Sequence, residues 1–184
     1  MHKLVDLKAV SPKISLEIVY ATPNNFTGKI VYSKPLCYLQ KSVAERLHRV
    51  QLGLEKKGLR LKVLDGYRPL SVQKIFWEFV PDPRYVADPA EGSKHNRGAA
   101  VDLTLIDRAG RELPMPTPFD DFTEKAHRNY QGGSKEAIRN RQILEEAMVK
   151  EGFVPIPTEW WHFDAPDWEN YPVLDISFEE LENR

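Results

Sequence analysis

The stretch SKHNRGAAVD, residues 93–102, runs from a polar turn into an alternating apolar pattern. Gly98 gives the backbone the freedom to turn toward a strand, because glycine adopts conformations that other residues avoid. Apolar residues then recur at every second position: Val101, Leu103 and Leu105. This alternation predicts a strand with Asp102 at its start, on the face opposite to the apolar residues. We therefore expect a loop histidine, His95, shortly before a strand that begins with a carboxylate.

The chain before this stretch predicts a helix followed by a strand. Apolar residues at helical spacing indicate a helix over residues 40–57, and Gly58 follows where a left-handed C-cap would lie. Apolar and polar residues alternate over residues 59–63, which predicts a strand that leads into the segment DGYRP at residues 65–69.

Three further elements complete the expected fold. Helices are predicted over residues 70–80 and 134–151, and the aromatic-rich residues 159–164 predict a strand. In the helix over residues 134–151, three residues are expected to be buried: Ile138, Leu144 and Met148. Helices thus alternate irregularly with short strands. We expect an α+β fold with a small, mostly antiparallel sheet flanked by helices, in a single domain over residues 1–184.

Composition narrows the class of protein. The chain has 184 residues, of which 41% are hydrophobic and 29% charged, as in ordinary globular domains. Its 26 basic and 27 acidic residues give a net charge of -1, which favours neither nucleic acid nor an anionic membrane as a partner. The one cysteine, Cys37, lies in an apolar stretch and predicts a buried free thiol, so a CxxC site is excluded.

The N-terminal sequence bears on the compartment. Asp6 stands where a signal peptide would have its apolar run, and no stretch approaches the ~18 apolar residues needed to span a bilayer. We therefore expect a cytoplasmic protein, or a periplasmic one if a signal peptide was removed before this numbering begins.

Two imidazoles and two carboxylates are available for a metal centre. His95, Asp102 and His162 offer three ligands, and Glu159 offers a separate carboxylate. A catalytic zinc site needs such an inventory: three protein ligands, an open position for water and a base to deprotonate that water. Taken singly, these residues also fit a solvated histidine, a turn-capping aspartate and a surface glutamate.

The segments SKHNRGAAVD at 93–102 and EWWH at 159–162 resemble the SxHxxGxAxD and ExxH signatures of the D-alanyl-D-alanine dipeptidases, the VanX-like zinc peptidases of family M15. Three supporting segments are similar to that family in the same order: YATPNNFTGK at 20–29, DGYRP at 65–69, and FD with EKAH between 119 and 127. The matches run from about residue 20 to residue 163, nearly the whole chain. The interval between Arg68 and His95 is shorter than in the glycopeptide-resistance enzymes.

The resemblance implies a fold shared with hedgehog domains and D,D-peptidases, and one zinc ion per chain. It implies that His95, Asp102 and His162 are the zinc ligands and that Glu159 is the catalytic base for the zinc-bound water. Residues three apart on a flat strand point to opposite faces. A bend near residues 157–159 is therefore required to turn Glu159 toward the ion.

The resemblance also implies roles around the substrate. Arg68 would polarise the scissile carbonyl and stabilise the oxyanion, a contribution of ~3–4 kcal/mol to the transition state. Asp120 matches the residue near the substrate ammonium, with Tyr20 beside it, and Ser93 matches a substrate-contacting serine. Each of these last three also fits a turn or core-edge residue.

These roles together imply a zinc D,D-dipeptidase that hydrolyses D-Ala-D-Ala to two D-alanines in peptidoglycan precursor turnover. A D,D-carboxypeptidase acting on peptidoglycan stem peptides is the nearest alternative. The segment of residues 20–29 argues against it, because in the resembled dipeptidases this segment helps to close the pocket around a free amino terminus, and Asp120 argues the same way. A non-catalytic zinc-binding module is a third possibility, which Glu159 with Arg68 opposite argues against. The expected partner is a small D,D-dipeptide. The sequence does not indicate the oligomeric state. It also does not indicate whether the enzyme serves antibiotic resistance or the recycling of D-Ala-D-Ala.

Overall fold

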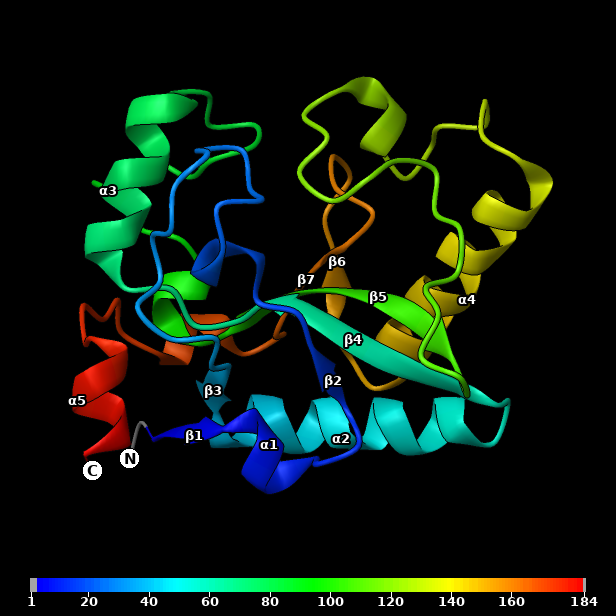
Figure 1. The fold of residues 1–184 in the computed structure, drawn as a ribbon, viewed down its shortest axis with the longest axis horizontal. Coiled ribbons are helices and arrows are strands. Elements are labelled where there is room, and N and C mark those ends of the chain that lie inside the picture. The colour runs from blue at the N-terminus through cyan, green and yellow to red at the C-terminus, as the bar shows by residue number, and fades with distance from the viewer. Residues whose placement is uncertain (1–2, 184) are drawn as a thin grey trace.

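The computed structural model of the chain describes residues 3–183, which form two sheets surrounded by helices (Figure 1). The strands and helices in chain order are β1 (Leu4–Asp6), α1 (Leu7–Val10), β2 (Ser15–Leu16), β3 (Tyr38–Gln40), α2 (Lys41–Glu55), β4 (Leu59–Asp65), α3 (Leu70–Phe79), β5 (Ala100–Asp107), α4 (Lys135–Lys150), β6 (Val154–Pro155), β7 (His162–Asp164) and α5 (Phe178–Glu182). Short 3-10 helices lie between them: Val19–Ala21, His95–Arg97, Glu124–Ala126 and Trp168–Asn170.

The main sheet has five strands in the order β2-β4-β5-β7-β6, and only the β2–β4 pair is parallel. A second, two-stranded sheet joins β1 to β3 in antiparallel fashion. The predicted α+β class with a small, mostly antiparallel sheet is therefore confirmed. The small sheet was not predicted, since strands of three residues carry too little alternation to stand out.

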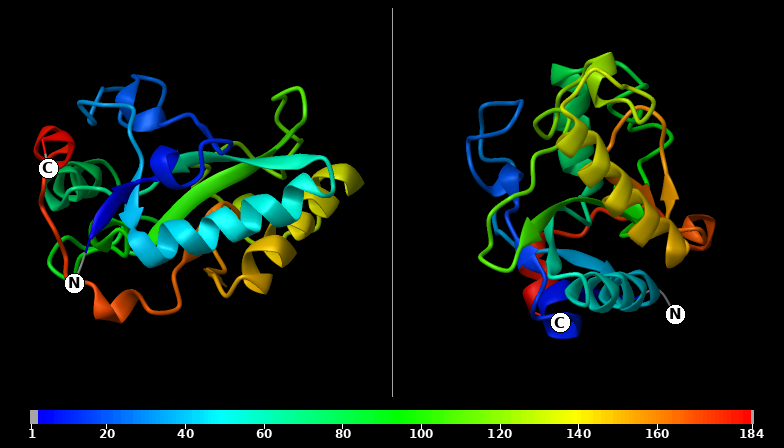
Figure 2. Two further views of the ribbon diagram at one scale, coloured as in Figure 1. Left: turned by 90° about the horizontal axis from the view of Figure 1, so that it is seen from below. Right: turned by 90° about the vertical axis from the view of Figure 1, so that its right-hand side faces the viewer.

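Helix α2 lies along one side of the main sheet (Figure 2). The apolar residues that recur at helical spacing in its sequence form its buried side. The helix contacts β4 and α4, and α4 in turn contacts β5 and β6. Its buried apolar residues are Val43, Ala44, Leu47, Val50 and Leu54. Burying one such leucine contributes ~1.5–3 kcal/mol. The helix ends before Gly58, whose φ of 75° is the left-handed conformation predicted for it.

Helix α4 covers the same side of the sheet and begins as predicted. The side chain of Ser134 caps it by accepting a hydrogen bond from the backbone of Ala137. Leu144 and Met148 are buried as expected, but Ile138 is only half-buried and the prediction for it was wrong. The buried side of α4 begins at Ala137, one residue earlier. Ile138 therefore lies at the edge of that buried side.

The strand predicted over residues 159–164 is shorter than expected. Only His162–Asp164 pairs as β7, and residues 160 and 161 form a turn before it. Buried apolar side chains from α1 to α5 join in one core cluster, in which Cys37 is a buried free thiol as predicted. Helix α3 and the loops of residues 81–94 and 116–133 stand on the side of the sheet opposite to α2 (Figure 1).

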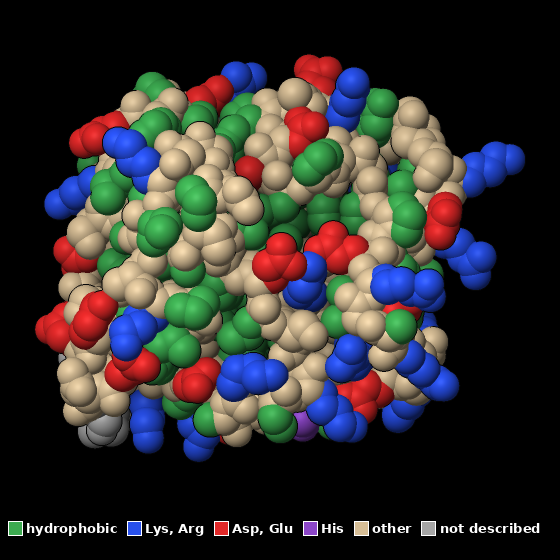
Figure 3. Space-filling view, in the orientation of Figure 1, with side chains coloured by type: hydrophobic (Ala, Val, Ile, Leu, Met, Phe, Trp, Pro, Cys, Tyr) green, Lys and Arg blue, Asp and Glu red, His purple; other side chains and the backbone are tan. Residues whose placement is uncertain are grey.

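The surface mixes the two signs of charge. On the face shown in Figure 3, acidic and basic side chains are interspersed, and hydrophobic side chains show in a central hollow. Among residues 3–183, no helix is long and apolar enough to cross a membrane.

Candidate metal centre and active site

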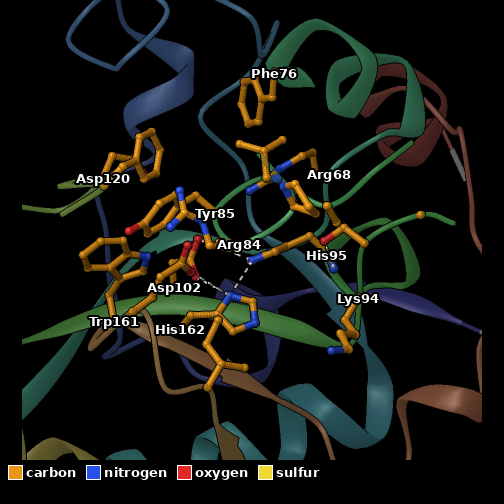
Figure 4. Close-up of a pocket in the computed structure, with 18 of the residues that line it drawn as sticks. Arg68, Phe76, Arg84, Tyr85, Lys94, His95, Asp102, Asp120, Trp161 and His162 are labelled. Carbon is orange, nitrogen blue, oxygen red and sulfur yellow. Dashed lines mark hydrogen bonds and ion pairs between the residues drawn. The ribbon is translucent and has the colours of Figure 1, made fainter. Parts of the chain in front are cut away.

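Three predicted ligands converge where β5 and β7 pair. Asp102 on β5 lies directly opposite His162 on β7, and His95 comes from the 3-10 helix just before β5. Nδ1 of His162 lies 3.1 Å from Nε2 of His95 and 2.9 Å from Oδ1 of Asp102. Gly98, with a φ of 64°, makes the left-handed turn expected between His95 and the strand. All three side chains are buried, and their ligand atoms lie within 4.8 Å of one another (Figure 4).

The other nitrogen of each imidazole already has an acceptor. Nδ1 of His95 lies 2.8 Å from the carbonyl oxygen of Gly66, and Nε2 of His162 lies 2.8 Å from Oδ1 of Asp164. A carbonyl or a carboxylate only accepts, so we assign the ring proton of each histidine to this outer nitrogen. The inner nitrogens then turn their lone pairs toward one point beside Asp102. Two lone pairs and a carboxylate at such distances could hold one metal ion between them, and this donor set suits zinc.

The same contacts explain the titration of the metal-free cluster. Burial lowers the pKa of His162, but its hydrogen bonds to Asp102 and Asp164 outweigh burial and raise that pKa to about 10. Burial raises the pKa of Asp102, whereas His95 and His162 pull it down to well below its ordinary value. A metal ion that binds to these groups competes with protons for them.

Glu159 lies beside this cluster. The turn that precedes β7 provides the bend that the sequence required, and it brings Oε2 of Glu159 to 3.8 Å from Nδ1 of His162. Burial raises the pKa of the Glu159 carboxyl to about 8, against the opposing effect of His162. A buried carboxyl with a raised pKa at the wall of a cavity is typical of a general acid or base.

Arg68 is held on the opposite wall by a dense set of hydrogen bonds. Its Nη2 and Nε donate to Oδ2 of Asp65, at 2.7 Å and 3.3 Å, and its Nη1 donates to Oε1 of Gln73 at 2.7 Å. The backbone N–H of Arg68 donates to the carbonyl of His95 at 3.1 Å, and the side chain of Asn96 donates to the carbonyl of Arg68 at 2.8 Å. The arginine segment and the histidine turn are therefore fixed to each other.

One cavity of about 460 Å³ joins all eight of the predicted site residues. They line it together: Tyr20, Arg68, Ser93, His95, Asp102, Asp120, Glu159 and His162. Figure 4 shows Arg68 and Asp120 above the level of the cluster that His95, Asp102 and His162 form. A cavity of this size accommodates a dipeptide next to the cluster.

A carboxylate lies at one part of the cavity wall. Oδ2 of Asp120 accepts a hydrogen bond of 2.9 Å from the hydroxyl of Tyr20, and burial raises the pKa of Asp120 well above its ordinary value. Asp120 adopts a φ of 60°, which is unusual for a residue other than glycine. Ser93 also lines the cavity, and its Oγ accepts from the backbone N–H of His95 at 3.2 Å, so it supports the turn as well.

Sequence reasoning missed two supporting carboxylates. Asp164 orients His162, and its Oδ2 lies 3.1 Å from Nζ of Lys94, while Asp65 orients Arg68. A signal for Asp164 was present: residues two apart on a strand share a face, so His162 and Asp164 had to lie side by side. For Asp65 the only signal was its place within DGYRP.

Comparisons with known proteins identify the family of the chain. The D-Ala-D-Ala dipeptidase model of the Peptidase_M15 family matches residues 1–180. The D-alanyl-D-alanine dipeptidase of Escherichia coli (strain K12) is 40% identical over 96% of this chain and 91% of its own. That of Enterococcus faecalis (strain ATCC 700802 / V583) is 32% identical over 86% of this chain and 89% of its own. A vancomycin-resistance D,D-pentapeptidase in complex with Zn(II) has 17% identity and a TM-score of 0.48, covering 72% of this chain and 75% of that one.

The family model spans nearly the whole chain, and the E. coli relative exceeds 30% identity over almost all of it. Such coverage includes every segment that lines the cavity. The protein is a metallopeptidase, and the chain belongs to the D-Ala-D-Ala dipeptidase family of M15 peptidases.

Proposed function

We propose that this protein is a zinc D,D-dipeptidase that hydrolyses D-Ala-D-Ala to two molecules of D-alanine, as a single domain with one zinc ion. The observation that carries the proposal is the cavity itself, in which the ligand cluster, a carboxylate for a base and an arginine face the same space. The buried Asp120 favours a substrate with a free amino terminus, because a buried carboxylate needs a cationic partner.

His95, Asp102 and His162 would hold the metal. When bound, zinc supplies a Lewis acid that acidifies water, polarises a carbonyl and favours the ionised form of Glu159. Asp164 and the carbonyl of Gly66 keep the two imidazoles in the tautomers that leave the ligand nitrogens free.

Glu159 and Arg68 then perform the proton transfer and the charge stabilisation. The carboxylate of Glu159 takes a proton from the attacking water as its oxygen bonds to the peptide carbonyl carbon. Negative charge develops on the carbonyl oxygen, and the guanidinium of Arg68 stabilises it. Glu159 returns the proton to the departing nitrogen as the C–N bond breaks, which yields an amine and a carboxylate.

Asp120 and Tyr20 would fix the amino end of the dipeptide. The ammonium group would supply a cationic partner for Asp120, while the hydroxyl of Tyr20 orients the carboxylate. Ser93, at the wall next to His95, offers a hydroxyl to the bound dipeptide. A D,D-carboxypeptidase acting on stem peptides would bring an acylated nitrogen to Asp120 and leave its charge unpaired.

The test is a comparison of substrates with and without a chelator. Purified protein should release D-alanine from D-Ala-D-Ala far faster than L-alanine from L-Ala-L-Ala, and a chelator should stop it. N-acetylation should lower kcat/KM by at least ~100-fold, the equivalent of ~3 kcal/mol for an unpaired buried charge. Equal cleavage of the acetylated dipeptide or of a stem pentapeptide would make the protein a carboxypeptidase.

The substitution Asp120→Asn tests the same contact between carboxylate and ammonium from the side of the protein. It should raise KM for D-Ala-D-Ala with zinc retained, whereas Asp121→Asn, a neighbouring carboxylate that does not line the cavity, should leave KM unchanged. A protein that binds zinc but hydrolyses none of these peptides would instead be a non-catalytic zinc module. For the compartment, the cytoplasm remains the prediction, and cell fractionation tests it.

A further inference from the structure

Gln73 is a fully buried glutamine on α3 whose two polar atoms have two different partners. Its Oε1 accepts from Nη1 of Arg68 at 2.7 Å, and its Nε2 donates to the carbonyl oxygen of Ala87 at 2.7 Å. Gln73 itself does not line the cavity, but Arg68 and Ala87 both do. The side chain therefore links two parts of the cavity wall from behind.

The chemistry of this link requires an amide. A guanidinium only donates hydrogen bonds and a backbone carbonyl only accepts them. Glutamine has one oxygen that accepts and one nitrogen that donates, so it satisfies both partners at once. A buried polar group that loses its partner is costly, so each end of the bridge holds the other in place.

The bridge also decides which donors of Arg68 remain available. A guanidinium has five N–H groups. Asp65 takes one from Nε and one from Nη2, and Gln73 takes one from Nη1, while the hydroxyl of Tyr32 also lies within hydrogen-bond reach of the guanidinium. The ring of Phe76, 4.6 Å from the guanidinium carbon, covers one of its faces. With two edges and a face fixed, the guanidinium cannot rotate without breaking a buried hydrogen bond.

Ala87 belongs to the segment between α3 and the turn of His95, and this segment contributes an outer wall of the cavity through residues 83–87 and 91–92. Its backbone carbonyl is tied to α3 by Gln73. We propose that Gln73 is a positioning residue of the reaction: it holds the guanidinium of Arg68 in the orientation that meets the developing oxyanion, and it couples that orientation to the position of the outer wall. This inference rests on the proposed function, because it assigns Arg68 to the transition state.

A double-mutant cycle distinguishes this role from simple support of the core. Gln73→Met keeps the length of the side chain and removes both hydrogen bonds. It should lower kcat for D-Ala-D-Ala by on the order of 10-fold to 100-fold, as misplacement of a catalytic group does, with a smaller change in KM. In an Arg68→Ala background the same substitution should change kcat by no more than about twofold, because the group it positions is gone.

Gln73→Glu separates the two ends of the bridge. A carboxylate still accepts from Arg68 but cannot donate to the carbonyl of Ala87. Its kcat should lie closer to wild type than that of Gln73→Met, while KM rises because the outer wall is released. This variant keeps the proposal testable if Gln73→Met does not fold.

Gln51 provides the matched control. It is a buried glutamine on α2 that does not line the cavity, and its Nε2 donates to Glu55 while its Oε1 accepts from the backbone of Leu61. Gln51→Met should reduce thermal stability and leave kcat unchanged. Zinc content and thermal stability, measured on every variant, exclude loss of fold or metal as the cause.

Three results would overturn the inference. One is a Gln73→Met loss of the same size with and without Arg68. Another is an equal loss in Gln51→Met, and the third is a wild-type kcat in Gln73→Met. Inactivity of the wild-type protein on D-Ala-D-Ala would instead refute the proposed function, so the two failures are distinguishable.

Discussion

Replacing Glu159 with glutamine distinguishes the proposed base from the proposed metal ligands. Glu159 lies 3.8 Å from His162, beside the ligand cluster but not a member of it. Glutamine has nearly the same volume, so it creates no cavity. It also replaces a carboxyl whose charged form burial disfavours, as its raised pKa shows, so the fold loses nothing. What it removes is the ability to accept a proton from water.

The size of the effect follows from that single loss. General base catalysis contributes ~10²–10⁴ to the rate, equivalent to ~3–5 kcal/mol of activation free energy. We expect kcat to fall by at least this factor in Glu159→Gln while KM changes little. Zinc content should remain near one ion per chain, because His95, Asp102 and His162 are untouched.

The assay combines D-alanine release with elemental analysis of protein purified without added metal. Asp102→Ala is the comparator, and it should lose both zinc and activity because it removes a ligand. Loss of zinc from Glu159→Gln would show that Glu159 is itself a ligand. Full activity in that variant would show that another group accepts the proton, and either result would refute the assignment.

Three further substitutions test the ligands, the arginine and the core. His95→Ala and His162→Ala should each lose zinc by elemental analysis. His48→Ala should keep it, because the ring of His48 contacts Ser11 and is not part of the cluster. Equal zinc in all three variants would exclude the proposed centre. Arg68→Ala should retain zinc but lose ~10²–10³ in kcat, and a change confined to KM would place Arg68 outside the transition state. Leu47→Ala should lower the free energy of unfolding by ~2–5 kcal/mol in denaturant titrations with kcat unchanged, and a loss below 1 kcal/mol would show that α2 is not packed as described.

The spacing of apolar residues was sufficient to predict the bounds of an element where that element is long and has one buried side. Helix α2 and strand β4 were predicted almost to the residue, because each has an uninterrupted pattern of apolar positions. Short elements escaped for the opposite reason. Strands β1 and β3 are stabilised by their pairing with each other, a long-range contact that no local pattern records.

The site was predicted by a different kind of reasoning. Chemistry suggested the two histidines and two carboxylates as a metal-site inventory, but the roles of all eight residues came from the resemblance of motifs, and no spacing rule placed Tyr20 next to Asp120, a hundred residues away. Chemistry alone did supply one detail: a base must face the metal, so a bend was required before His162, and a turn lies there. The residues that orient other residues were missed, since a carboxylate such as Asp164 looks the same in sequence whether it meets solvent or an imidazole.

The register of three strands explains why these groups meet at all. Asp65 on β4 lies opposite Asp102 on β5, and Asp102 lies opposite His162 on β7, so one row across the sheet contains a partner of Arg68 and two of the proposed metal ligands. The register between β4 and β5 shifts between Val63 and Asp65, and this irregularity is what sets Asp65 against Asp102. A slip of one residue would turn Asp102 to the other face of the sheet. The apolar residues that alternate with it along β5 hold that register in the core, so the packing of the sheet fixes the geometry of the chemistry.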